Sequence, residues 1–277
     1  CARLRRYDGD ARVLAGGTDL LVKMKHRRLL SRHLINIKRI PNLDHIRYDD
    51  QAGLRIGALV AAQAIKESSV VANKVPLLSQ AAGKLGTLQI RHIATLGGNL
   101  ANASPSAEFA PALLTLGAAV KCVGSAGERL IPIDEFFVGP GKSALRSDEV
   151  ITEIQVPNPH ANATGIYLKH ALRRMDVAIA AVAVVVRLEG GVCEEAKIAL
   201  SAVGPTPFRA RKAEAALRGQ KLGRDASARA LIREAAGLAL NESLPINDFR
   251  DYAEHRRELV GKLVEQALEH VASRAHA

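Results

Sequence analysis

Two pairs of adjacent glycines, Gly16-Gly17 and Gly97-Gly98, constrain the fold of this 277-residue chain more than any other feature. The first pair follows Val13 and Leu14 and precedes apolar residues at helical spacing, which predicts a strand, a turn and a helix. The second pair ends the apolar segment 91–96, where we also expect a strand. Glycine has no Cβ, so both turns could let backbone N–H groups approach a phosphate. Neither is a GxGxxG or P-loop motif, and either alone is more often a structural turn.

The apolar runs around and after these turns predict an alternation of strands and helices. Strands are expected at 34–37, 54–58, 118–123 and 149–156, helices at 20–29, 61–69, 77–85 and 109–116, and further α/β structure at 131–137. Pro157 and Pro159 then interrupt the pattern, because proline fixes φ and disfavours helix in the residue before it. We therefore expect a first domain at 1–157 and a second at 160–277.

The second domain is expected to begin with a sheet and end with helices. Its β-rich runs 178–188 and 192–203 are joined by Gly190-Gly191, which is typical of a hairpin. After Phe208 the apolar residues recur at helical spacing. This pattern predicts a small sheet covered by helices.

The formal charge of +11 raises the question of nucleic-acid binding, and the first fifty residues hold 12 Lys and Arg against 6 Asp and Glu. Aromatic residues are only 3% of the chain and Trp is absent, which removes the usual stacking surfaces for single strands. We therefore expect no nucleic-acid partner. The surplus is either a solvated basic face or a surface that attracts an acidic partner, dinucleotide phosphates or an anionic acceptor.

The three cysteines, Cys1, Cys122 and Cys193, are too scattered for a disulfide framework or an iron–sulfur motif, so no metal centre is expected on this chain. Cys122 lies in an expected buried strand and is interpreted as core. The longest apolar run, 178–186, is about half of the roughly twenty residues that a transmembrane helix needs. The chain begins with Cys1 and shows no signal peptide, so we expect a trimmed cytoplasmic protein without a membrane span.

Three segments resemble motifs of one family, the FAD-binding subunits of molybdenum hydroxylases such as xanthine and carbon monoxide dehydrogenase. The segments AGGTDL at 15–20 and TLGGNLANASP at 95–105 resemble the two FAD-binding motifs of that family. The segment GPTPFRA at 204–210, with EAALRG at 214–219, resembles the signature of the family's C-terminal domain. The resemblance implies an α+β fold, with a PCMH-type FAD-binding α/β region of two subdomains followed by a domain of antiparallel sheet and helices.

The resemblance also implies which residues bind FAD. The pyrophosphate is expected to be wrapped by Ala15, Gly16, Gly17, Thr18, Asp19 and Leu20. The second wall of the site is expected from Thr95, Gly98 and Asn99, with Gly97 and Asn102 of the same motif also binding the cofactor. Glu108 stands where the family often has Asp, and its carboxylate is expected to face ribityl or ribose hydroxyls.

Three further positions match the surroundings of the isoalloxazine ring in the xanthine dehydrogenase branch. Leu85 and Ile151 are expected to flank the ring, although both could equally be ordinary core residues. Lys169 is expected beside the flavin, where a cation would stabilise the reduced anion; the alternative is a solvated charge at a strand end.

The function implied by the resemblance is electron transfer. FAD on this chain would relay electrons between 2Fe-2S clusters of a small subunit and an external acceptor such as NAD, while a large molybdopterin subunit acts on the substrate. We expect a dimer of such heterotrimers. The alternatives are a stand-alone FAD-dependent oxidase, for which the roughly 118 residues after Pro159 look too few and too helical, and a basic binding module for nucleic acid or acidic protein.

Overall fold

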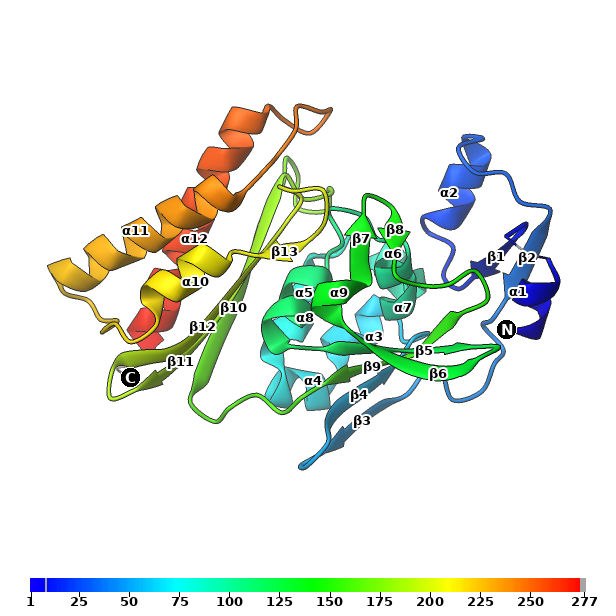
Figure 1. Ribbon diagram of the computed structural model, residues 1–277, viewed down its shortest axis with the longest axis horizontal. Helices are drawn as coiled ribbons and strands as arrows, with labels where there is room; N and C mark the ends of the chain where they lie inside the picture. The colour runs from blue at the N-terminus through cyan, green and yellow to red at the C-terminus, as the bar shows by residue number, and fades with distance from the viewer. Residues whose placement is uncertain (8, 275–277) are drawn as a thin grey trace.

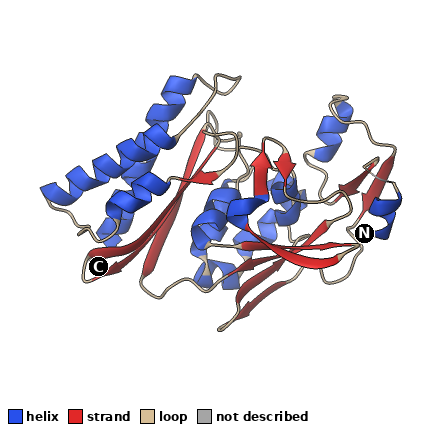
Figure 2. Ribbon diagram, viewed as in Figure 1, coloured by secondary structure: helices blue, strands red, loops and turns tan. Residues whose placement is uncertain are grey.

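The computed structural model describes residues 1–7 and 9–274, and it contains helices and sheets in alternating layers (Figure 2). One end of the molecule holds a short N-terminal unit that stands apart from the layers (Figure 1). In this unit, strand β1 (Ala11–Leu14) pairs in parallel with β2 (His33–Asn36). Helices α1 (Ala2–Arg6) and α2 (Leu20–Lys25) belong to the same unit.

The central sheet has five strands in the order β3-β4-β9-β5-β6, and all of its neighbouring strands are antiparallel. Its strands are β3 (Ile46–Asp49), β4 (Gly53–Gly57), β5 (Ala119–Gly124), β6 (Gly127–Pro132) and β9 (Val150–Val156). The helices of the same region are α3 (Ala62–Glu67), α4 (Ser69–Lys74), α5 (Pro76–Lys84), α6 (Leu88–Ile93), α7 (Leu96–Ala101), α8 (Ala110–Leu116) and α9 (Ile133–Phe136). Strands β7 (Phe137–Gly139) and β8 (Lys142–Ser143) form a separate small hairpin.

The C-terminal sheet has four antiparallel strands in the order β10-β11-β12-β13. They are β10 (Ala163–His170), β11 (Ala180–Glu189), β12 (Val192–Ser201) and β13 (Phe208–Arg209). Helices α10 (Arg211–Leu217), α11 (Ala226–Glu242) and α12 (Ala253–Arg274) pack on the outer side of this sheet, while α5 and α8 pack on its inner side (Figure 1).

Strand β11 is buried on both faces, and its two faces differ in side-chain size. Val182 and Val184 pack into the core shared with the outer helices, whereas Ala181 and Ala183 pack into the core of the central region. Successive strand residues point to opposite faces, so this alternation gives each core its own set of β11 side chains. The small alanines let α8 lie close to β11.

The predicted α+β fold class is confirmed, and among the residues that the structure describes only β1 and β2 pair in parallel. The hairpin predicted around Gly190-Gly191 is confirmed as β11 and β12, and Cys122 is fully buried in β5 as expected. The helix expected at 20–29 ends earlier, since Arg27 has a positive φ of 54°. The boundary at Pro157 to Pro159, which lies between β9 and β10, stays a prediction.

The strand predicted at 91–96 is wrong, because the first part of this segment belongs to helix α6. Thr87 caps that helix by accepting a hydrogen bond from the Ile90 backbone N–H at 3.2 Å. A hydroxyl in this position satisfies one of the N–H groups that a helix start leaves without a partner. The chain is extended only at Ala94 and Thr95 before α7 begins, so the second glycine pair lies in the first turn of a helix.

Candidate FAD-binding site

A cavity of about 640 Å³ lies between the β1–α2 turn and the first turn of α7, a volume in the usual range for cofactor sites. Every residue predicted to bind FAD lines it, apart from Lys169. These residues are Ala15, Gly16, Gly17, Thr18, Asp19, Leu20, Leu85, Thr95, Gly97, Gly98, Asn99, Asn102, Glu108 and Ile151. Segments far apart in the sequence therefore meet around one hollow.

The β1–α2 turn forms the first wall, and close packing against α6 fixes its position. A Cβ added to Gly16 would lie 2.0 Å from the backbone oxygen of Ile93, so only glycine fits there. Gly17 has a φ of +81°, which side chains with a Cβ rarely adopt. Asp19 stands at the start of α2, and burial raises the pKa of its carboxyl despite the nearby Lys23 ammonium.

The first turn of α7 forms the second wall. Thr95 Oγ1 accepts a hydrogen bond from the Gly98 N–H at 3.1 Å and caps the helix. A Cβ on Gly97 would lie 2.7 Å from the Cβ of Ala58, so this glycine allows α7 to pack against the end of β4. A Cβ on Gly98 would approach only Thr95 Oγ1, at 2.8 Å, so the protein's backbone does not require glycine there.

Lys23 links the two walls, although the sequence indicated it only as part of the basic surplus. Its Nζ donates to Asn102 Oδ1 at 2.6 Å, which joins α2 to the end of α7 across the cavity lining. A half-buried ammonium is thereby held beside both turns. Such a cation would attract an anionic group placed between them.

A buried polar cluster lies behind the cavity at Glu108. Its Oε2 accepts from Lys169 Nζ at 2.7 Å, and its Oε1 accepts from the Tyr167 hydroxyl at 2.5 Å. Lys169 Nζ also donates to the backbone oxygen of Lys84 at 2.9 Å. Burial raises the pKa of Glu108, with Lys169 opposing the effect. Burial, followed by the Glu108 carboxylate, raises the pKa of Tyr167 well above its usual value.

The alternative interpretation of Lys169 as a solvated charge is wrong, because only 3% of its side chain is exposed. Its long stem lies under the cavity wall, and its charge is paired with a carboxylate 61 residues earlier in the chain. A buried ammonium needs such a partner, since removing a charge from water is costly. The place of Lys169 beside the flavin remains a proposal.

Leu85 and Ile151 are buried core residues that also line the cavity, and their place beside the isoalloxazine ring stays a prediction. Arg91 holds the turn after α5 in place: one guanidinium nitrogen donates to the backbone oxygens of Leu85 and Gly86, at 3.2 and 3.0 Å. Its Nε donates to Gln63 Oε1 at 2.8 Å. Arg91 therefore fixes the position of Leu85 at the cavity edge.

Several further lining residues were given no role in the sequence analysis. They are Arg12, Lys23, Leu29, Ile37, Ala58, Gly86, Ile90, Ala94, Ala101, Ser104, Ser106, Ala107, Gly141, Leu145, Glu149, Val150, Met175, Asp176 and Val177, with Val13 from the predicted strand. Ser104 and Ser106 could have been found, since Ser104 lies within the second motif and Ser106 directly follows it. Residues 175–177 belong to the connection between β10 and β11, which carries no recognisable sequence signal.

Within residues 1–7 and 9–274, no three His, Cys, Asp or Glu side chains cluster in a way that could hold a metal ion. In the same part of the chain, every helix is too short or too polar to cross a membrane. Burial raises the pKa of the Cys122 thiol to about 11.

Comparisons with known proteins cover nearly the whole chain. Residues 1–159 match the family described as FAD binding domain in molybdopterin dehydrogenase, and residues 166–271 match the CO dehydrogenase flavoprotein C-terminal domain. The glyceraldehyde dehydrogenase medium chain of Sulfolobus acidocaldarius is 32% identical over 95% of this chain and 91% of its own length. The carbon monoxide dehydrogenase medium chain of Hydrogenophaga pseudoflava is 34% identical over 96% of this chain and 91% of its own.

A solved structure agrees with these sequence matches. Carbon monoxide dehydrogenase from Hydrogenophaga pseudoflava, in a form lacking the Mo-pyranopterin moiety of the molybdenum cofactor, contains a chain that superimposes with a TM-score of 0.93. The match has 34% sequence identity and covers 99% of this chain and 93% of that one. Both domains therefore keep the arrangement seen in that structure.

Proposed function

The chain belongs to the family of FAD-binding flavoprotein subunits of molybdopterin dehydrogenases, which are oxidoreductases, and from this we propose how it works. It binds one FAD noncovalently and relays electrons between 2Fe-2S clusters of a partner subunit and an external acceptor such as NAD. FAD, when bound, supplies chemistry that links one-electron carriers to two-electron acceptors. The residues of this chain bind that group, exclude water from it and set the charge around it.

The observation that carries this proposal is the placement of Gly98. Gly98 lies in the first turn of α7, where its N–H donates to Thr95 Oγ1 and an added Cβ would meet only that same oxygen. At Gly98 the protein therefore opposes a side chain with one side-chain oxygen, whereas at Gly16 on the opposite wall it does so with the backbone of Ile93. A pyrophosphate that approaches the Gly98 backbone closely explains why glycine stands at a position where the protein's backbone does not require it.

The other lining residues fit the remaining parts of FAD. Lys23 would neutralise phosphate charge between the walls, and the Glu108 carboxylate would accept from ribityl or ribose hydroxyls. Leu85 and Ile151 offer apolar side chains suited to a flat ring. Lys169 forms an ion pair with Glu108, and the charges of this pair would act on the ring.

The expected partners are a small 2Fe-2S subunit and a large molybdopterin subunit, assembled as a dimer of heterotrimers. The relatives support a multisubunit assembly, since they are named medium chains or subunits. The basic surplus in the first fifty residues would favour association with an acidic partner surface.

The proposal is tested by purifying the chain from its source without disrupting complexes. We expect a yellow preparation with one FAD per chain, with flavin released into the supernatant by acid or heat, and with iron and molybdenum on co-purifying chains. A colourless chain that never binds FAD would contradict the proposal and favour a basic binding module. A monomer without iron or molybdenum that oxidises a substrate with its own FAD would instead indicate a stand-alone oxidase.

A further inference from the structure

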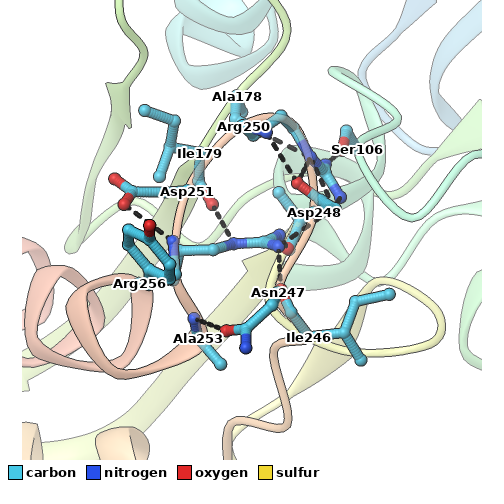
Figure 3. A network of polar contacts seen from close by, with 12 residues as sticks. Ser106, Ala178, Ile179, Ile246, Asn247, Asp248, Arg250, Asp251, Ala253 and Arg256 are labelled. Atoms are coloured by element: carbon cyan, nitrogen blue, oxygen red, sulfur yellow. Dashed lines mark hydrogen bonds and ion pairs between the residues drawn. The ribbon is translucent and has the colours of Figure 1, made fainter.

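The loop between α11 and α12, residues 243–252, reaches back to the cavity through a network of arginines (Figure 3). At its centre Arg256 is only 1% exposed. Its guanidinium donates to the backbone oxygen of Ile246 at 2.7 Å, to that of Ile179 at 3.3 Å and to that of Ala202. These bonds hold the loop against the ends of β11 and β12.

Asp248 connects Arg256 to a second arginine of the loop. Its Oδ2 accepts from Arg256 at 3.1 Å and from Arg250 at 2.5 Å. The hydrogen bonds from Arg250 lower the pKa of Asp248 to about 2, so the carboxylate stays ionised at any ordinary pH. Arg250 is therefore held by a permanent counter-charge and has a fixed direction.

The far end of Arg250 reaches the wall of the cavity. Its NH1 group donates to Ser106 Oγ, across 144 residues of sequence, and to the backbone oxygen of Ala178 at 3.5 Å (Figure 3). Ser106 is a lining residue two positions before Glu108. The neighbouring Pro105 is held from the same side, since its backbone oxygen accepts from the Ala202 N–H at 2.6 Å.

The chemistry of the two groups fixes the direction of this bond. Arginine can only donate, so Ser106 Oγ must act as the acceptor. A serine hydroxyl also has one proton to donate, and within residues 1–7 and 9–274 no acceptor is bonded to it. The half-buried hydroxyl thus has a proton available at the cavity surface.

We propose that Ser106 donates this proton to an acceptor oxygen of the bound cofactor, and that Arg250 is the positioning residue that holds Ser106 for the purpose. Arg250, a residue of the C-terminal domain, would in this way contribute to FAD binding without touching the cofactor itself. This inference rests on the proposed function, because it assigns Ser106 to the same cavity.

The test compares the rates at which the full-length holoprotein releases FAD, followed by the rise in flavin fluorescence on dilution. Ser106→Ala and Arg250→Met should each speed release by about tenfold, as expected when one charge-assisted contact is lost. The double variant should release FAD no faster than either single variant, because both substitutions break the same series of contacts, from Arg250 through Ser106 to the cofactor. Arg250→Lys, which keeps a donor, should recover part of the loss.

Arg257→Met is the matched control, since Arg257 is an exposed neighbour on α12, and it should release FAD at the wild-type rate. Ser106→Ala removes a single oxygen, so it decides the matter even if Arg250→Met fails to fold. An unchanged release rate for Ser106→Ala, or single effects that multiply in the double variant, would overturn the inference. A wild-type chain that holds no FAD would instead contradict the proposed function.

Discussion

The two glycine pairs line the same cavity, but the reason why glycine is required differs between them. In the first pair the protein itself imposes glycine, because Gly16 lies against the Ile93 backbone and Gly17 has a positive φ. In the second pair, Gly97 is imposed by close packing on Ala58, whereas Gly98 has no positive φ and a Cβ there would meet only Thr95 Oγ1. Both glycines of the first wall are thus required by the fold. In the second wall, Gly98 is explained by a bound ligand instead.

This difference shows how a glycine's neighbours separate structural from binding roles. Substitution at Gly16 changes the protein and the site together, so loss of FAD there says little about contact with the cofactor. Substitution at Gly98 changes mainly the space offered to a ligand.

Gly16→Val should abolish FAD binding and also weaken the N-terminal unit. The new side chain would overlap the backbone of Ile93, and such overpacking lowers the free energy of unfolding by about 2 kcal/mol or more. Thermal unfolding and flavin content per chain measure the two effects. A variant with wild-type unfolding would show that the contact between the turn and α6 is dispensable.

Gly98→Val should abolish FAD binding but lower the free energy of unfolding by only about 1 kcal/mol, because the new side chain meets just the Thr95 hydroxyl that caps α7. Only the Thr95 side chain must adjust. Flavin absorbance and thermal unfolding again provide the measurement. Full flavin content in this variant would mean that Gly98 is no more than a structural glycine, and the comparison between the pairs would fail.

Lys23→Met should weaken FAD binding by about tenfold, since it removes a charge and the bond that joins the two walls. Lys25→Met, on the exposed side of the same helix, is the control and should bind FAD normally. Affinity is measured by quenching of flavin fluorescence. Equal losses in both variants would indicate a general effect of surface charge.

Glu108→Gln and Lys169→Met should shift the flavin potential in opposite directions and by unequal amounts. Removing the carboxylate leaves the Lys169 cation unopposed, which stabilises reduced flavin and raises the potential by about 30 mV. Removing the Lys169 cation leaves the buried Glu108 carboxyl, whose pKa is already raised, so this carboxyl takes up a proton. The potential therefore falls by less than it rises in Glu108→Gln. Redox titration measures the flavin potential of each variant. If neither potential changes, the pair of Glu108 and Lys169 does not tune the flavin.

The sequence allowed the glycine pairs, the hairpin and the buried Cys122 to be predicted, because each has a local signal. The same signals could not tell a glycine turn from a glycine-rich first turn of a helix, and residues 91–96 were assigned to a strand for that reason. A short apolar run fits either element. The hydroxyls of Thr87 and Thr95, each three residues before the N–H that it caps, were the missed indication of two helix starts.

The charged part of the site could not be predicted in the same way. Lys169 and Glu108 are 61 residues apart, and Arg250 and Ser106 are 144 apart. Periodicity reports on neighbours in the chain, whereas these pairs depend on how complete domains pack. The resemblance identified Glu108 and Lys169 singly, but only the structure joined them as an ion pair.

The face of β11 that carries Ala181 and Ala183 covers the central region, and this has a consequence for folding during synthesis. During synthesis the N-terminal region leaves the ribosome first, yet α5 and α8 are covered only when β10 to β12 pack on them. Until residues 180–201 have emerged, an apolar surface remains open on an otherwise complete chain segment. A fragment ending near residue 159 would keep that surface permanently exposed and would be prone to aggregate. The two domains can be distinguished in the sequence, but each needs the other to bury its apolar surface and fold stably.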